Sequence, residues 1–231
     1  MTSRANKMNA FGPLKALHRP STKNESAKAV IFHGFGANAY DLFDLNQMMD
    51  PQSQLDWYFP NGPLEVPIGP GFFGRAWFPL DTEALERALQ SGGGVDYVDV
   101  RPAGMDEAVQ KALRFLQEIH FNPQTDFLGG FSQGSMMAVD IVRQLPQTPK
   151  GLFIFSGALV DKKGFSSDQM GFKGLRVYQS HGMQDEILPL RGAEKLRDQL
   201  RSLGANVEWH DFRGGHEIPF EVLSRAAQFL K

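Results

Sequence analysis

Short apolar runs alternate along the chain with longer segments in which apolar residues recur every three or four positions. Residues 29–32 read Ala-Val-Ile-Phe, a continuous run typical of a strand buried on both faces. Between Met105 and His120 the three- and four-residue spacing instead predicts an amphipathic helix. Further strands are predicted at 57–59, 125–128, 152–155, 176–179 and 207–212, and further helices at 39–49, 83–90, 133–145, 190–203 and 220–230.

Strands and helices alternate almost to the end of the chain, which predicts a single α/β domain over residues 1–231. We expect a mostly parallel central sheet with helices on both faces. Two segments depart from the pattern. Residues 1–27 predict an irregular start with a short edge strand near 14–18. Residues 61–80 are rich in proline and glycine and predict a long irregular loop of the kind that often carries function.

Composition excludes several classes of function. The 231 residues carry a net charge of −2 with no basic stretch, so nucleic acid is not an expected partner. Cysteine is absent, which rules out disulfides, thiolate metal sites and a cysteine nucleophile. No secretory signal or membrane-spanning stretch is recognisable, so we expect a cytoplasmic protein without membrane insertion, and no metal site.

The pentapeptide Gly130-Phe131-Ser132-Gln133-Gly134 has the G-x-S-x-G pattern of a nucleophile elbow. In such an elbow the serine occupies a strained turn, and the flanking glycines let strand and helix approach closely. By chance the pattern would occur in roughly one chain in ten of this length, so a bystander serine is the alternative. Its position between a predicted strand and a predicted buried helix favours Ser132 as the nucleophile.

A serine hydrolase of this kind places nucleophile, acid and base in that order along the chain. Of the downstream histidines, His181 precedes the acid candidates, and His210 lies within a predicted strand. His216 follows two glycines in the last loop and is the best candidate base. Asp185 lies just beyond a predicted strand and is the candidate acid, with the adjacent Glu186 as its alternative.

The segment His33-Gly34-Phe35-Gly36 follows the first well-defined strand. Acyl transfer needs two N–H donors directed at the developing oxyanion. In enzymes with a nucleophile elbow of this kind, one donor comes from the residue after the nucleophile and the other from an early loop. The backbone N–H groups of Gln133 and Phe35 are therefore the candidate oxyanion hole.

The same segment also fits a loose dinucleotide-binding pattern, Gly34-x-Gly36-x-x-Ala39. That pattern requires an acidic residue about 20 positions later, at the carboxyl end of the next strand. Asp56 has the spacing but precedes the predicted strand at 57–59. A nicotinamide-dependent oxidoreductase is therefore a distant alternative.

Together, four segments resemble the phospholipase/carboxylesterase family of α/β-hydrolases, which includes bacterial carboxylesterases and acyl-protein thioesterases. They are His33–Gly36, Gly130–Ser135, the His181-Gly182-x-x-Asp185-x-x-Leu188-Pro189 motif and Gly215–Pro219. Gly74–Phe78 also looks like the tryptophan-containing loop of that family. The resemblance implies a serine carboxylic-ester hydrolase that needs no cofactor. It places Ser132, Asp185 and His216 at the triad positions and the backbone of Phe35 and Gln133 at the oxyanion hole.

Apolar side chains close to these motifs suggest how substrate is selected. We hypothesise that they line a pocket for a short to medium acyl chain: Phe72, Phe73, Trp77, Phe78, Met183 and Leu188. The expected substrate is a small-molecule ester or an acyl thioester. A lysophospholipase with the same triad and a non-catalytic binding protein of the same fold are the alternatives, and a homodimer is compatible with the sequence.

Overall fold

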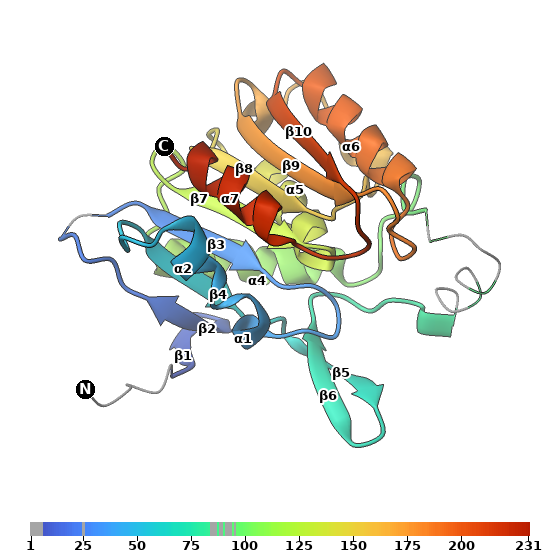
Figure 1. Cartoon of the computed structure of the whole chain (residues 1–231), viewed down its shortest axis with the longest axis horizontal. Helices are drawn as coiled ribbons and strands as arrows, with labels where there is room; N and C mark the ends of the chain where they lie inside the picture. Colours follow the sequence, from blue (N-terminus) through green and yellow to red (C-terminus); the bar gives the residue numbers. More distant parts are fainter. Residues whose placement is uncertain (1–6, 25, 84–86, 88–89, 91–93, 95) are drawn as a thin grey trace.

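The structure, a computed structural model, describes residues 7–24, 26–83, 87, 90, 94 and 96–231. An eight-stranded sheet forms its centre in the order β1-β2-β4-β3-β7-β8-β9-β10 (Figure 1). β1 and β2 pair in antiparallel fashion, as do β2 and β4, and all other neighbours are parallel. The strands are β1 (Asn9–Phe11), β2 (Leu14–Arg19), β3 (Lys28–Phe32), β4 (Asp56–Pro60), β7 (Phe127–Phe131), β8 (Gly151–Phe155), β9 (Arg176–Gly182) and β10 (Asn206–Phe212).

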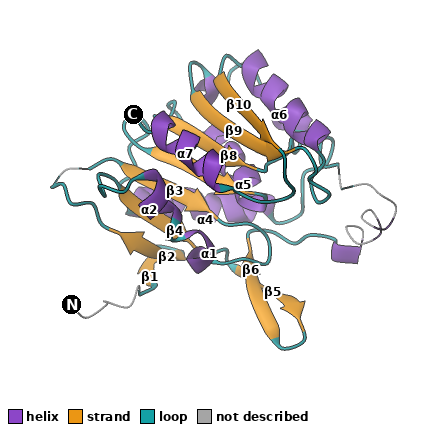
Figure 2. Cartoon of the chain, viewed as in Figure 1, coloured by secondary structure: helices purple, strands orange, loops and turns teal. Residues whose placement is uncertain are grey.

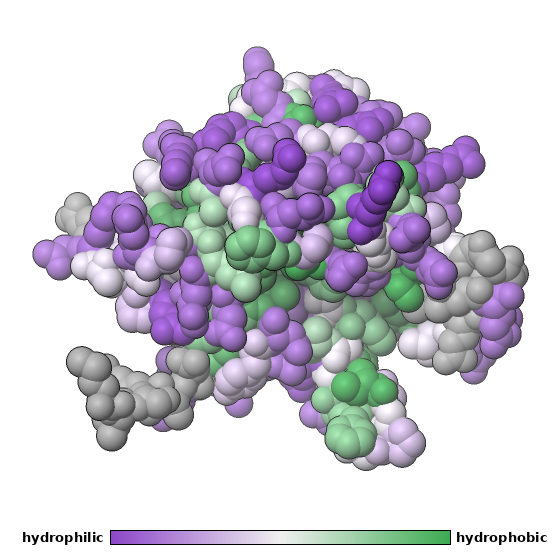
Figure 3. Space-filling view, viewed as in Figure 1, coloured by the Kyte–Doolittle hydropathy of each residue, from purple (hydrophilic) through white to green (hydrophobic). Residues whose placement is uncertain are grey.

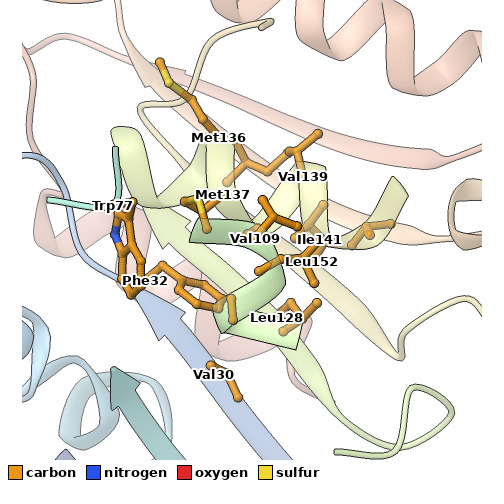
Figure 4. Close-up of a cluster of buried hydrophobic side chains, with 14 of the residues drawn as sticks. Val30, Phe32, Trp77, Val109, Leu128, Met136, Met137, Val139, Ile141 and Leu152 are labelled. Atoms are coloured by element: carbon orange, nitrogen blue, oxygen red, sulfur yellow. The ribbon is translucent and has the colours of Figure 1, made fainter. Parts of the chain in front are cut away.

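Helices cover both faces of the sheet because its central strands are apolar on both sides. In β3, Val30 and Phe32 belong to one buried cluster, whereas Ala29 and Ile31 belong to another. Figure 4 shows part of the first cluster. It is completed by α4 (Met105–Glu118), α5 (Gln133–Gln144) and α6 (Leu190–Ser202), and the second cluster by α1 (Ala39–Leu42), α2 (Leu45–Met49) and α7 (Phe220–Phe229).

The predicted fold is confirmed: strands and helices occur in the expected order, and the sheet is mostly parallel. The single helix expected at 39–49 is instead two short helices, α1 and α2. An Asn38 capping box begins α1, in which the Asn38 side chain accepts from the Tyr40 N–H and Asp41 accepts from the Asn38 N–H. Most of the helix predicted at 83–90 lies outside the described residues.

The prediction of a long irregular loop at 61–80 is wrong. These residues contain a two-stranded antiparallel ribbon, β5 (Leu64–Gly69) and β6 (Phe72–Ala76), which projects from the body of the molecule (Figure 2). The turn contains Gly71 at a φ of 75°. Proline is tolerated in β5 because this strand is an edge strand of the ribbon, and the register shifts beside Pro67. Proline and glycine content therefore misled the prediction.

The edge strand predicted near 14–18 is confirmed as β2, and a further short strand, β1, pairs with it. The start of the chain is therefore less irregular than expected from residue 9 onward. Within the described residues, none of the helices combines the length and apolar character needed to cross a bilayer.

Candidate active site

Ser132 lies at the sharp turn between β7 and α5, with φ 54° and ψ −118°, values that non-glycine residues rarely adopt. Its N–H donates to the Phe155 carbonyl at 2.9 Å, which ties the turn to β8. A Cβ on Gly130 would overlap the carbonyl of Gly134, and a Cβ on Gly134 would overlap the carbonyl of Phe32. The two glycines are thus required by the close approach of β7, α5 and β3, which presents Ser132 at the carboxyl edge of the sheet.

The helix that follows the serine begins at Gln133, so its first N–H groups have no partner within the helix. In the described part of the chain the Gln133 N–H makes no hydrogen bond to a backbone carbonyl. Ser135, one turn into the helix, is buried, and its Oγ lies 2.5 Å from the Gly130 carbonyl oxygen and 2.9 Å from that of Phe155. The arrangement holds the positive end of the α5 dipole beside Ser132.

The Asp185 side chain is buried just past the end of β9 and is enclosed by donors. Its Oδ1 accepts from the N–H groups of Ile187 at 2.9 Å and Leu188 at 2.8 Å. Its Oδ2 lies 2.7 Å from Nδ1 of His216, a residue 31 positions later in the chain. The structure therefore brings the predicted acid and the predicted base into direct contact. Glu186, the alternative acid, takes no part in this bond.

His181 also contacts this carboxylate, a contact that sequence reasoning missed. Its Nε2 lies 2.7 Å from the Leu188 carbonyl and 3.3 Å from Oδ2 of Asp185. A carbonyl only accepts, so Nε2 carries the proton. Burial lowers the pKa of His181, and within the described residues its Nδ1 has no partner. The His-x-x-x-Asp spacing was the available signal.

The loop that carries His216 packs closely on the segment that follows β9 and contains Asp185, here called the acid loop. Gly182 lies so near the carbonyl of Gly215 that a Cβ there would overlap it. Ser156 Oγ donates to the Glu217 carbonyl at 3.2 Å, and the imidazole of His216 lies 4.9 Å from the Phe131 ring, centroid to centroid. In the described chain Ser132 Oγ forms no hydrogen bond with His216, and such catalytic bonds are often open in free enzymes.

The loop at 33–37, which was predicted to supply an oxyanion donor, lies against both the nucleophile and the ribbon. A Cβ on Gly34 would lie 3.3 Å from Cβ of Ser132. The Gly36 N–H donates to the Arg75 carbonyl at 2.9 Å, and the Arg75 N–H donates to the Ala37 carbonyl at 2.8 Å. Among the described residues the Phe35 N–H has no backbone acceptor. It is therefore free to donate to a substrate.

The Gln133 side chain joins the two candidate donor regions. Its Oε1 accepts from the Trp77 N–H at 2.9 Å, and its Nε2 donates to the Phe78 carbonyl at 2.8 Å. The indole N–H of Trp77 in turn donates to the His33 carbonyl at 2.8 Å. Segments 33–37, 75–78 and the start of α5 therefore form one hydrogen-bonded unit.

The six residues predicted to line an acyl pocket do not gather in one place. Trp77, Phe78 and Leu188 are buried in the hydrophobic core. Figure 4 shows Trp77 next to Phe32, and the two rings lie 5.1 Å apart between centroids. Phe72 and Phe73 are 70% and 62% exposed near the ribbon turn. Figure 3 shows apolar side chains at the end of the projecting ribbon. Met183 is exposed next to the acid loop.

The dinucleotide-binding alternative fails on the position of its acidic residue. Asp56 begins β4, and its carboxylate contacts His18 Nε2 at 3.1 Å and Ser26 Oγ at 2.5 Å. It therefore lies at the amino end of the strand, whereas the Gly34–Gly36 turn lies beyond the carboxyl end of the adjacent strand β3. A ribose bound at that turn could not reach Asp56.

The sheet, the elbow serine and the bonded carboxylate–imidazole pair define a serine hydrolase of the α/β-hydrolase fold. A model of the phospholipase/carboxylesterase family matches residues 18–231, and the chain belongs to this family. The predicted activity, hydrolysis of carboxylic esters or thioesters by a serine enzyme, is confirmed.

The chain is similar to individual relatives over most of its length. It is 28% identical to acyl-protein thioesterase 1 of Kluyveromyces lactis, over 94% of this chain and 97% of the relative. It is 23% identical to lysophospholipase-like protein 1 of Mus musculus, over 93% and 92%. The crystal structure of esterase PE8 is similar with a TM-score of 0.79 and 28% identity, over 94% of this chain and 97% of that one.

Proposed function

We propose that Ser132, His216 and Asp185 form the catalytic triad of an esterase and thioesterase that acts on short to medium acyl chains. The single observation that carries this proposal is the 2.7 Å bond between His216 Nδ1 and Asp185 Oδ2 at the sheet edge that presents the Ser132 elbow. Because Nδ1 donates to the carboxylate, the proton-accepting nitrogen of the neutral imidazole is Nε2.

The reaction proceeds by two acyl transfers. His216 Nε2 takes the proton of Ser132 Oγ as the oxygen attacks the substrate carbonyl carbon, and the carbonyl oxygen becomes an oxyanion. The N–H groups of Phe35 and Gln133 stabilise that charge. As the intermediate collapses, the imidazolium gives its proton to the departing alcohol or thiol. Water then repeats the sequence on the acyl-enzyme, releasing the acid and regenerating Ser132.

Asp185 is placed to accept from His216 throughout this cycle. Two backbone N–H groups bind Oδ1, which leaves Oδ2 for the imidazoles of His216 and His181. These contacts on one buried carboxylate fix its rotamer. The proposed role of Asp185 is to select the His216 tautomer and to stabilise the imidazolium that forms when Ser132 loses its proton.

Hydrolysis of p-nitrophenyl esters from acetyl to dodecanoyl, and of acyl thioesters, tests this proposal. We expect one optimum of acyl length and a loss of at least about 10³-fold in kcat for Ser132→Ala. Ser202→Ala, an exposed serine on α6, is the matched control and should leave kcat unchanged. Turnover that survives Ser132→Ala, or a folded wild type inactive on every ester and thioester, would contradict the proposal.

A lysophospholipase is the second candidate, favoured by the exposed side chains of the ribbon. Ile68, Phe72 and Phe73 are each more than half exposed, on the ribbon whose strand β6 hydrogen bonds to the candidate oxyanion loop at 33–37. An enzyme that works on lipid aggregates should hydrolyse lysophosphatidylcholine faster above its critical micelle concentration. A rate that follows monomer concentration alone would reject this candidate.

Two further predictions from the sequence concern the surroundings of the enzyme. A homodimer and a cytoplasmic location both remain predictions. Light scattering on purified protein measures the first, and fractionation of the producing cell measures the second.

A further inference from the structure

His33 is a buried histidine at the end of β3 whose ring the proposed mechanism does not use. Its Nδ1 lies 2.7 Å from the Gly34 carbonyl oxygen, and its Nε2 accepts from the Gly62 N–H at 2.9 Å. A backbone N–H only donates and a carbonyl only accepts, so Nε2 is bare and Nδ1 carries the proton. Both contacts therefore require the same neutral tautomer. Burial agrees with this assignment, because it lowers the pKa of His33 to about 4.

The carbonyl that accepts the hydrogen bond from His33 Nδ1 belongs to the peptide between Gly34 and Phe35. The N–H of that same peptide is the candidate oxyanion donor. The Gly34 carbonyl accepts a second bond from the Ala37 N–H at 3.3 Å. Hydrogen bonds accepted by a carbonyl polarise its peptide, and the N–H at the other end becomes a stronger donor in a low-dielectric site.

We propose that His33 is a positioning residue that strengthens the oxyanion hole by donating from Nδ1 to the Gly34 carbonyl. The inference rests on the proposed function and deepens it, since it assigns the donor strength of the Phe35 N–H to a side chain that never touches substrate. A neutral imidazole suits this task because it accepts from Gly62 and donates to Gly34 at the same time.

The surroundings hold the imidazole in this arrangement. Gly62 lies so close to the Ala76 carbonyl that a Cβ would overlap it, and Arg75 Nε donates to the Gly62 carbonyl at 3.0 Å. The Trp77 indole N–H binds the His33 carbonyl, with the two rings 5.2 Å apart between centroids. The donor to Nε2 is thus fixed by the base of the ribbon.

A matched pair of substitutions separates polarisation from simple bracing of the loop. In His33→Asn the amide nitrogen replaces Nδ1 and still donates to the Gly34 carbonyl, but the bond from Gly62 is lost. In His33→Gln the amide oxygen replaces Nε2 and still accepts from Gly62, but the donor to Gly34 is lost. Each variant therefore keeps one of the two hydrogen bonds of His33 and loses the other.

We expect His33→Asn to retain kcat within about tenfold of wild type and His33→Gln to lose about 10²-fold, close to the loss of one oxyanion donor. KM should change less than about threefold in both, because the donor acts mainly in the transition state. Equal losses in the two variants, or a larger loss in His33→Asn, would overturn the inference. Thermal unfolding of each variant shows whether it is folded.

A measurement on the wild type does not depend on how the variants fold. In the two-bond ¹H–¹⁵N correlation spectrum at pH 7, His33 should appear neutral with its proton on Nδ1. An imidazolium or a proton on Nε2 would overturn the inference. A wild type without ester or thioester turnover would instead contradict the proposed function, whereas an active wild type with equally impaired variants contradicts only the role of His33.

Discussion

The two loops that flank Ser132 each contain a buried His-Gly pair at the end of a parallel strand, yet the two histidines are used differently. In the oxyanion loop both ring nitrogens of His33 are hydrogen bonded. In the acid loop only Nε2 of His181 is bonded, and its proton faces two acceptors, the Leu188 carbonyl and Asp185 Oδ2.

The difference follows from where the partners come from. His33 is fixed by a donor 29 positions away, on the chain leading into the ribbon, whereas His181 binds a carbonyl only seven positions away in its own loop. The oxyanion side is therefore held by contacts between distant segments. On the acid side the ring of His181 has a local partner, and distant contacts come from the backbone bonds of Met183 and Gln184 to residues 212 and 214 and from the bond of Asp185 to His216. Two identical His-Gly pairs at the ends of parallel strands therefore differ in function. The difference depends on which groups elsewhere in the fold hydrogen bond to each imidazole.

The largest expected effect comes from the acid side. Asp185→Asn should lower kcat about 10⁴-fold, because an amide can present its NH₂ to His216 and favour the wrong tautomer. Stopped assays with a p-nitrophenyl ester measure the loss, and circular dichroism checks the fold. Glu186→Gln is the matched control and should stay within about threefold of wild type. A strong loss of kcat in Glu186→Gln, together with an active Asp185→Asn, would mean that Glu186 and not Asp185 is the acid.

On the oxyanion side, the buried His33 should make the free energy of unfolding depend on pH. His33 has a folded pKa of about 4 against 6.5 when exposed, so between these values the unfolded chain binds more protons. Stability is then fully present above about pH 6.5 and falls as the pH drops toward 4, by on the order of 3 kcal/mol. Asp41 and Arg75 are the charged groups that act on the ring, in opposite directions.

Urea unfolding of wild type and His33→Asn between pH 4 and 7 measures this contribution. The wild type should lose more stability than the variant across this window, and the difference isolates His33 from the other buried histidines. Parallel curves for the two proteins would mean that His33 keeps an ordinary pKa.

A smaller effect is expected from His181. His181→Leu removes the donor to the Leu188 carbonyl and to Asp185, which should cost about 1–3 kcal/mol of unfolding free energy and about tenfold in kcat. His181→Gln places an amide donor near Nε2 and should recover most of both losses. If the glutamine variant were no better than the leucine variant, His181 would act by volume alone.

The smallest effect on stability is expected at the ribbon. Phe72→Ser and Phe73→Ser remove exposed rings and should change the unfolding free energy by less than about 0.5 kcal/mol. Turnover of acetyl esters should be unchanged, while kcat/KM for longer chains falls if these rings contact the acyl group. A uniform fall for all chain lengths would instead mean that the ribbon affects the oxyanion loop it is bonded to.

Much of the candidate site could be predicted because its signals are local. The elbow pattern around Ser132 needs only a strand, a turn and a helix, and the chain order expected of a triad leads to the candidates Asp185 and His216. The acyl pocket could not be predicted in the same way. Trp77 and Phe72 are both aromatic residues of one proline-rich segment, yet one is buried in the core and the other is 70% exposed.

The sequence by itself determined the alternation of strands and helices, the strained serine and the order of the candidate catalytic residues. These depend on periodicity, glycine spacing and chain order, which are properties of neighbouring residues. Only the tertiary structure decided that residues 61–80 form a ribbon against the oxyanion loop, that His181 binds the acid, and that His33 bridges Gly62 and Gly34. Those outcomes depend on which donors and acceptors from distant segments meet in a buried space, where each must find a partner.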